Sequence, residues 1–217
     1  MKSSKMDNAS SHGEGIESQP SCPMGYGTKS KFLVNPRNMM PEISTTPESP
    51  EQTASLSQAR EISSIPKTGS AACWQYPSPQ MFYNALIRRE KEAESDSMDA
   101  VVHVHNFVNE ETWKKILEFE KLHYASCPTP SLQRFIGKSE ELSPQAFFKQ
   151  IYLGRPFDRH DWFVDRCGQK TVRYIIDYYD APSADGFDVQ IDVRPAADTL
   201  DNVWDRLRVS FRSLLGM

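Results

Sequence analysis

The sequence predicts an α+β fold in which several helices pack against an antiparallel sheet. Three β-type runs follow one another with only short turns between them, at residues 162–165, 172–179 and 187–194. The last of these runs alternates strictly between apolar and polar residues, which is typical of an antiparallel meander with one solvated face. Helical patterns begin near residues 79, 144 and 199. Helices packed against an antiparallel sheet define the α+β class.

Residues 1–70 are predicted to form a disordered tail, and residues 71–217 a single folded domain. The first segment is poor in apolar residues and rich in Ser, Thr and Pro, so it cannot bury enough apolar area to offset the entropy of ordering its chain. The tail contains Cys22-Pro23, in which the proline holds the chain away from helix and exposes the sulfur. An ordinary tail cysteine is the favoured interpretation, and a thiolate ligand for haem iron is the alternative.

Two of the predicted helices share a capping pattern. Ser78 and Ser143 are each followed by a proline at the first helical position, which is a common helix start. The last helix is predicted to begin at Asp198 or Thr199. Its apolar stripe comprises Leu200, Val203, Trp204, Leu207, Phe211, Leu214 and Leu215. We expect this stripe to pack into the core, the commoner fate of such a face, and attachment to a membrane surface is the alternative.

The stretch 100–107 is predicted to be a strand, with a helix starting at Asn109. Alternation would place His103 and His105 on one face, where both side chains can reach a single metal ion. Two histidines without a carboxylate are a weak metal signal, and two structural histidines are the simpler interpretation. A single histidine facing an exchangeable partner is also what haem binding requires.

Charge, hydropathy and cysteine spacing exclude several classes of protein. The chain has 25 Lys and Arg against 29 Asp and Glu, a net charge of −4, which argues against a general nucleic-acid binder. No apolar run approaches the roughly 20 residues of a membrane span, and we see no signal peptide or cleaved transit peptide. The four cysteines form no C-x-x-C pair and are not expected to form a disulfide framework.

The densest cluster of chemically active residues is Arg159-His160-Asp161. A carboxylate beside His160 would orient the ring and make it more basic, and Arg159 is suited to hold a carboxylate of a ligand. A surface ion-pair network is the alternative interpretation. The sequence has no phosphate-binding loop, dinucleotide glycine pattern, serine nucleophile elbow or H-E-x-x-H motif.

Several blocks of residues, in order along the chain, carry a family resemblance. They are Cys22-Pro23-Met24, Trp74-Gln75-Tyr76-Pro77-Ser78-Pro79, His105-Asn106, Cys127-Pro128, Arg134-Phe135, Pro156-Phe157-Asp158-Arg159-His160-Asp161-Trp162, Arg173-Tyr174-Ile175-Ile176-Asp177-Tyr178-Tyr179 and Asp192-Val193-Arg194-Pro195. Together they resemble the mitochondrial holocytochrome c synthases, also called cytochrome c haem lyases, over essentially all of residues 71–217.

This resemblance implies a lyase that attaches haem b to apocytochrome c or c1. Thioether bonds would form between the haem vinyl groups and the two thiols of the substrate's C-x-x-C-H motif. Haem b would be a substrate that is held transiently. The family works in the mitochondrial intermembrane space, peripherally on the inner membrane, so the same location is expected here.

The resemblance also implies roles for individual residues. His105 is expected to be the axial ligand of the haem iron, and Cys22-Pro23 corresponds to a haem regulatory motif. Catalytic roles are expected for His105, Arg159, His160 and Asp161. Haem contacts are expected from Asn106, Trp74, Tyr76, Arg134 and Trp162. The aromatic rings would stack on the macrocycle, and Arg159 or Arg134 would pair with a propionate. Two alternatives are a non-catalytic haem sensor or chaperone, and a non-haem metal protein using His103 and His105.

Overall fold

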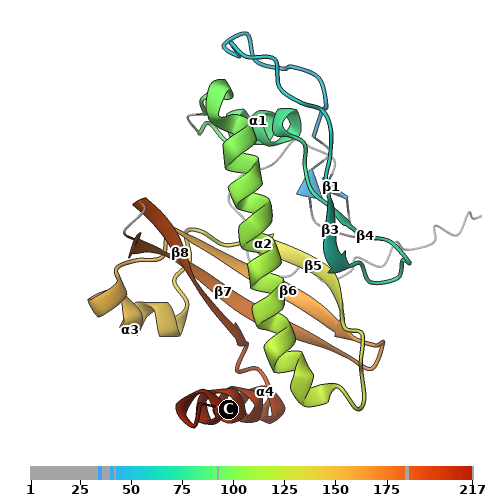
Figure 1. Cartoon of the computed structure of the whole chain (residues 1–217), viewed down its shortest axis with the longest axis vertical. Coiled ribbons are helices and arrows are strands. Elements are labelled where there is room, and N and C mark those ends of the chain that lie inside the picture. The colour runs from blue at the N-terminus through green and yellow to red at the C-terminus, as the bar shows by residue number, and fades with distance from the viewer. Residues whose placement is uncertain (1–33, 36–39, 42, 92, 184–185, 217) are drawn as a thin grey trace, which may run out of the picture. The chain divides into compact units, whose positions relative to one another are not determined.

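A four-stranded antiparallel sheet forms the centre of the computed structural model, which describes residues 34–35, 40–41, 43–91, 93–183 and 186–216 (Figure 1). The strand order is β5-β6-β7-β8, with bounds Ser131–Gly137, Asp158–Arg166, Lys170–Ser183 and Gly186–Pro195. Two short antiparallel pairs precede the sheet: β1 and β2 (Val34–Asn35 and Met40–Pro41), and β3 and β4 (Ile62–Pro66 and Cys73–Gln75). The predicted α+β class is confirmed, and Cys22-Pro23 lies outside the described residues.

The three strands predicted near the C-terminus are confirmed, and each is longer than its apolar run. Strand β6 turns into β7 through Cys167 and Gly168, which both have a positive φ, of 54° and 73°. Strand β5 was not predicted, and it pairs with β6 through a register shift between Leu132 and Arg134. The boundary predicted at residue 70 stays a prediction; β3 lies before it, and Ile65 of β3 is buried.

The helix starts predicted from capping patterns are also confirmed. Helices α1 (Pro79–Ile87) and α3 (Pro144–Leu153) begin at proline, and the hydroxyl oxygens of Ser78 and Ser143 accept hydrogen bonds from backbone N–H groups in the first turn. Helix α4 (Leu200–Leu214) is capped in the same way by Thr199. These caps satisfy N–H groups that have no partner within the helix.

The strand predicted at residues 100–107 is wrong, because these residues lie within the 23-residue helix α2 (Met98–Glu120), which follows a short 3-10 turn, η1 (Ser95–Ser97). Met98, Val102 and Asn106 are buried at the four-residue spacing of one helical face. The β-branched residues between them imitate strand alternation, which is a local signal that tertiary packing overrides. The predicted cap at Asn109 is wrong for the same reason, since its amide bonds to the His105 carbonyl inside the helix, at 2.8 Å.

The core lies between α2 and one face of the sheet. Figure 1 shows α2 crossing the strands, with a second 3-10 turn, η2 (Lys121–His123), at its C-terminal end. The buried residues of this cluster are Ile65, Trp74, Trp113, Ile116, Phe119, Leu132, Trp162, Val164, Val172, Tyr174, Ile176, Tyr178 and Val193. Even-numbered residues of β6 therefore face α2, and the odd-numbered ones face the other side of the sheet.

Helix α4 presents its apolar stripe to solvent, so the expected packing of this stripe into the core is wrong. Leu200 and Leu214 are 89% and 83% exposed, whereas Asn202 and Asp205 are the residues that α4 buries. Polar side chains, together with the partly buried Val209, thus attach the helix to the domain. Within the described residues, none of the helices combines the length and the apolar content needed to cross a bilayer.

Two cysteines form a disulfide that was not expected. Cys127 and Cys167 are bonded, with their Cα atoms 5.6 Å apart and 40 positions separating them in sequence. The bond joins the segment before β5 to the turn between β6 and β7. A pairing of this range leaves no local spacing pattern, since only the fold brings the two residues together. Cys73 is free and partly buried.

Candidate functional site

His105 lies on α2 in a partly buried position lined by aromatic and amide side chains. The Asn109 amide nitrogen lies 3.2 Å from His105 Nε2, one helical turn away. Phe82 of α1 meets the imidazole edge to face at a centroid distance of 5.0 Å, and Tyr76 does so at 6.3 Å. Burial lowers the pKa of His105 below 6.5, so the ring is neutral at pH 7 and has a nitrogen lone pair available to a metal.

Tyr76 is held by a carboxylate on the next turn of α2. Its hydroxyl donates to Glu110 Oε1 at 2.8 Å. Glu110 also accepts from the Ser64 backbone N–H at 3.0 Å and from the Ser64 hydroxyl. Asn106 is buried, and its amide donates to Glu61 at 2.9 Å. These contacts fix the segment containing β3 and β4 against the helical turn that carries His105.

His160 is directed to the same side of the sheet as His105. Its ring packs edge to face on Tyr178 of β7 at 5.7 Å, and Nε2 lies 3.5 Å from Asp158 Oδ2. Gly137 of β5 lies opposite His160, where a Cβ atom would come within 3.3 Å of the ring. Among the described residues, the buried Nδ1 of His160 has no hydrogen-bond partner. Buried polar atoms in proteins are nearly always paired, so this nitrogen needs a partner from outside the described residues, such as a water or a ligand.

The electrostatics of the two histidines are connected. Burial is the main cause that lowers the pKa of His160, and the positive charge of Arg89 lowers it further, whereas the charges of Asp158 and Asp161 raise it. The charge of His160 in turn lowers the pKa of His105, and Asp158 raises it. The His105 and His160 rings, Arg89 and Asp158 therefore belong to one electrostatic neighbourhood, in which both rings are neutral at pH 7.

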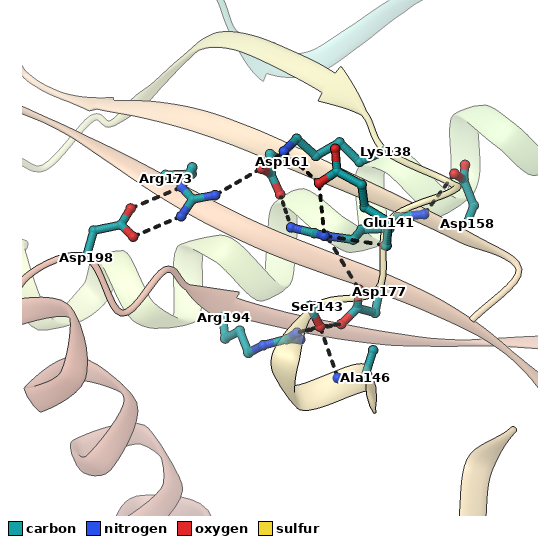
Figure 2. Close-up of polar contacts among 11 residues, drawn as sticks. Lys138, Glu141, Ser143, Ala146, Asp158, Asp161, Arg173, Asp177, Arg194 and Asp198 are labelled. Carbon is teal, nitrogen blue, oxygen red and sulfur yellow. Dashed lines mark hydrogen bonds and ion pairs between the residues drawn. The ribbon is translucent and has the colours of Figure 1, made fainter. Parts of the chain in front are cut away.

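Arg159 and Asp161 lie on the opposite face of β6 from His160. Figure 2 shows Asp161 in a network of polar contacts with residues of β7, β8 and the segment that leads into α3. Arg159 belongs to the same network through its ion pairs with Asp161 and Asp177. Arg159 Nη2 lies 3.2 Å from Asp161 Oδ1, and Arg173 donates to Asp161 Oδ2 at 3.1 Å. Asp177 accepts from Arg194 at 2.5 Å and from Ser143 at 2.8 Å. The structure thus separates Arg159 and Asp161 from the two histidines.

The other predicted haem contacts are divided in the same way. Trp74 and Trp162 are core residues, 8% and 2% exposed, and the Trp74 indole donates to the Leu132 carbonyl at 2.9 Å. The Arg134 guanidinium stacks 4.1 Å from the centroid of the Phe163 ring, on the sheet face away from α2. Of the predicted haem contacts that lie within the described residues, only Tyr76 and Asn106 are beside His105.

The predicted metal site of His103 and His105 is not formed, because the two residues lie on a helix and not on a strand. Residues two apart on a helix point in widely different directions, and His103 is exposed while His105 is partly buried. The part of the chain that the structure describes contains no group of three or more His, Cys, Asp or Glu residues that could hold a metal ion.

An open groove runs along the flank of α2, between this helix and β8. Its volume is about 550 Å³. Its lining is mostly apolar and includes Val104, Phe107, Val108, Val189 and Ile191. Val104 and Val108 flank His105 along α2, so the groove and the histidine share a helical turn.

Several members of the site were not predicted as site residues, among them Phe82, Asn109 and Tyr178. The amide of Asn109 reaches the His105 ring only because the two residues are one helical turn apart, a relation that a strand assignment hides. Phe82 and Tyr178 come from distant segments, and no local pattern distinguishes them from core aromatics.

Comparison with known proteins assigns the family. The family model described as cytochrome c/c1 heme lyase matches residues 2–210. The chain is 44% identical to the holocytochrome c-type synthase of Gallus gallus over 217 residues, covering 94% of this chain and 78% of that protein. It is 44% identical to the Homo sapiens holocytochrome c-type synthase over 202 residues (88% and 74%) and 39% identical to the Saccharomyces cerevisiae holocytochrome-c synthase over 225 residues (90% and 82%). No solved structure matches the chain. With most of its length matched, this protein belongs to the cytochrome c/c1 haem lyase family.

Proposed function

We propose that this lyase attaches haem b covalently to apocytochrome c or c1, with His105 as the axial ligand of the iron. The observation that carries the proposal is the setting of His105: a partly buried imidazole in contact with the rings of Phe82 and Tyr76, whose pKa is lowered by burial. Neutral imidazole is the common protein ligand of haem iron. Asn109 contacts the same ring, and its amide would turn from Nε2 to its second acceptor, the His105 carbonyl, when iron binds.

The surroundings of His105 fit a flat, apolar substrate with an anionic edge. Phe82 and Tyr76 supply aromatic surface beside the ring. Arg89, exposed just beyond α1, is the cation that acts on His160. We propose Arg89 as a partner for a haem propionate, a role that the position of Arg134 on the far sheet face does not favour. His160 would donate or accept a hydrogen bond through Nδ1, which has no partner among the described residues.

The main contribution of the protein to the reaction would be to position the haem and the substrate thiols. Each thiol of the substrate's C-x-x-C-H motif adds across one vinyl group: sulfur bonds to the carbon next to the porphyrin ring, and hydrogen goes to the terminal carbon. Nothing is oxidised and nothing leaves. Holding two reactants in the reactive geometry can lower the barrier by roughly 7–11 kcal/mol. The substrate's own histidine would bind the iron face opposite His105 and so bring both thiols to the vinyl groups.

The polypeptide substrate needs an open surface beside the haem. The groove between α2 and β8 is such a surface, since it is apolar, exposed and shares a helical turn with His105. We propose that the segment of apocytochrome next to its C-x-x-C-H motif lies there. Phe107, which is 60% exposed in the groove, would be its main apolar contact.

Arg159 and Asp161 have a different part in this proposal from the one expected of catalytic residues. Their ion pairs lie across the sheet from the histidines, so they would position β6, and with it His160, without touching the haem. Trp74 and Trp162 would act as core residues that do not touch the haem.

The last two parts of the proposal concern the cellular location of the protein and the role of Cys22-Pro23. We propose that the protein works in the mitochondrial intermembrane space, peripherally on the inner membrane, as the family resemblance implies. Cys22-Pro23 would act as a second, regulatory haem ligand, and thioether formation would not depend on it.

The test is co-expression of the full chain with an apocytochrome, followed by haem staining of a denaturing gel. We expect His105→Ala to abolish both haem that co-purifies with the protein and the stained product. Cys22→Ala is the matched control and should leave the product unchanged. Normal haem loading in the His105→Ala variant would contradict the ligand assignment. Haem binding by the native protein without any stained product would instead indicate a haem sensor or chaperone.

A further inference from the structure

The outer face of α4 is an unpartnered apolar surface on the described part of the chain. We define this outer face by seven side chains: Leu200, Val203, Trp204, Leu207, Phe211, Leu214 and Leu215. They recur at intervals of three and four residues, and their exposed fractions range from 38% to 89%. Isolated exposed apolar residues are normal on a protein surface, but a continuous stripe over a whole helix marks an interaction site.

The attachment of α4 to the domain explains why this face stays open. The inward side of the helix carries two buried polar residues: the Asn202 amide donates to the Ala196 carbonyl at 2.8 Å, and Asp205 lies 2.8 Å from His123 and 3.3 Å from Arg166. Val209, also on this side, is partly buried and packs against the core. These contacts hold α4 in place without any contribution from the outer face. The outer face can therefore bind a partner while α4 keeps its place on the domain.

Cations border the outer face. Arg208 lies along one edge, 5.9 Å from the Trp204 ring centroid, and Arg212 follows it by one turn. Asp201, the acidic residue on the same side, already pairs with Lys170 at 3.1 Å. The free charge on this border is thus positive, and an anionic surface would complement it.

We infer that the outer face of α4 binds an anionic lipid surface, with the helix lying flat in the interface between headgroups and acyl chains. A helix with Leu, Phe and Trp on one face, arginines at the border and a low overall apolar content is typical of interfacial helices. Trp204 beside Arg208 suits the headgroup level, where aromatic rings and cations gather. A second copy of the same face would bring arginine borders together, so charge disfavours self-association there.

This inference rests on the proposed membrane association and assigns it to one element. The test is co-sedimentation of the full chain with vesicles of phosphatidylcholine, with and without a third of phosphatidylglycerol. We expect binding that is stronger to the anionic vesicles and that weakens with salt. The Leu207→Ser/Phe211→Ser double variant should reduce the partition coefficient by at least tenfold, since two large apolar side chains leave the interface.

Two further variants separate the contributions. Arg208→Gln/Arg212→Gln should remove the preference for anionic vesicles and keep the weaker binding to neutral ones. Ile62→Ser is the matched control, because Ile62 is an isolated apolar side chain, 75% exposed, on a different element. All these positions are exposed, so thermal unfolding should be unchanged.

Tryptophan emission gives a second, direct readout. The chain has four tryptophans, of which Trp74, Trp113 and Trp162 are at most 8% exposed and Trp204 is 59% exposed. Vesicle addition should shift the emission to shorter wavelength in the native protein, and Trp204→Phe should remove the shift while binding persists.

The outcomes are distinct. If the native protein binds neither kind of vesicle, the proposed membrane association and this inference both fail. If the native protein binds and the Leu207→Ser/Phe211→Ser variant binds equally well, membrane association stands and the assignment to α4 is overturned. A native dimer that the same double variant converts to monomer would show that a second copy covers the face, and it would also overturn the inference.

Discussion

Reduction of the Cys127–Cys167 disulfide should destabilise the domain substantially. The bond closes a loop with a sequence separation of 40 residues. In the chain-entropy treatment, a cross-link of that span removes enough freedom from the unfolded chain to stabilise the fold by about 4 kcal/mol. For a domain of this size, with a urea dependence of about 2–3 kcal/mol per molar, the unfolding midpoint should fall by about 1.5 M on reduction.

The assay is urea unfolding followed by tryptophan emission, with and without reductant, in parallel with thiol titration. The Cys127→Ala/Cys167→Ala variant should unfold at the midpoint of the reduced native protein and show no response to reductant. Cys73→Ala is the control and should keep the full response, because Cys73 is a free thiol. If titration shows that two further thiols have appeared and the midpoint has not moved, the reasoning from loop closure is refuted.

Three further predictions concern the site and the attachment of α4. Burial lowers the pKa of His105 below 6.5, so the unfolded chain binds this proton more tightly than the folded protein does. Haem affinity and stability should therefore be constant at neutral pH and should decline as the pH falls below 6.5 through the lowered pKa. Spectrophotometric haem titration at several pH values measures the affinity. Gly137→Ala should lower haem affinity and cost about 1–2 kcal/mol of stability, because the new methyl group presses on His160; an unchanged haem titration and urea midpoint would contradict the close packing. Arg166→Met should cost about 3–5 kcal/mol, since it leaves the buried Glu120 carboxylate without its cation, although the Tyr174 hydroxyl still donates to it. Adding Glu120→Gln should recover part of that loss in urea unfolding.

Sequence patterns predicted strands β6, β7 and β8 and the starts of α1, α3 and α4 because those signals are local. The alternation in β8 and the Ser-Pro starts of α1 and α3 involve neighbouring residues only. The assignment of α2 failed where valines and histidines alternate by chance, over a segment whose helical state depends on burying Met98, Val102 and Asn106 together. The length of α2 could not be predicted either, since this stretch contains no glycine or proline that would mark a helix boundary.

The candidate site was predicted in part. His105 was expected from the family resemblance, and the structure brings Tyr76, Asn106 and His160 to the same region. Arg159 and Asp161 lie on the opposite face of β6 from His160. Strand alternation alone predicts this once β6 is known to start at Asp158. The burial of Asn202 and Asp205 in place of the apolar stripe of α4 had no signal in the sequence, because an amphipathic pattern does not tell which face meets the protein.

Helix α2 has a mechanical consequence for the reaction. His105 and Glu120 are 15 positions apart on this one uninterrupted helix, a span of about 22 Å. Glu120 pairs with Arg166, and Arg166 pairs with Asp205 of α4, so the helix is a rigid spacer between the turn that carries His105 and α4 (Figure 1). With α4 resting on lipid, the spacer would set the height at which haem chemistry takes place and leave clearance for an unfolded polypeptide to approach from the aqueous side.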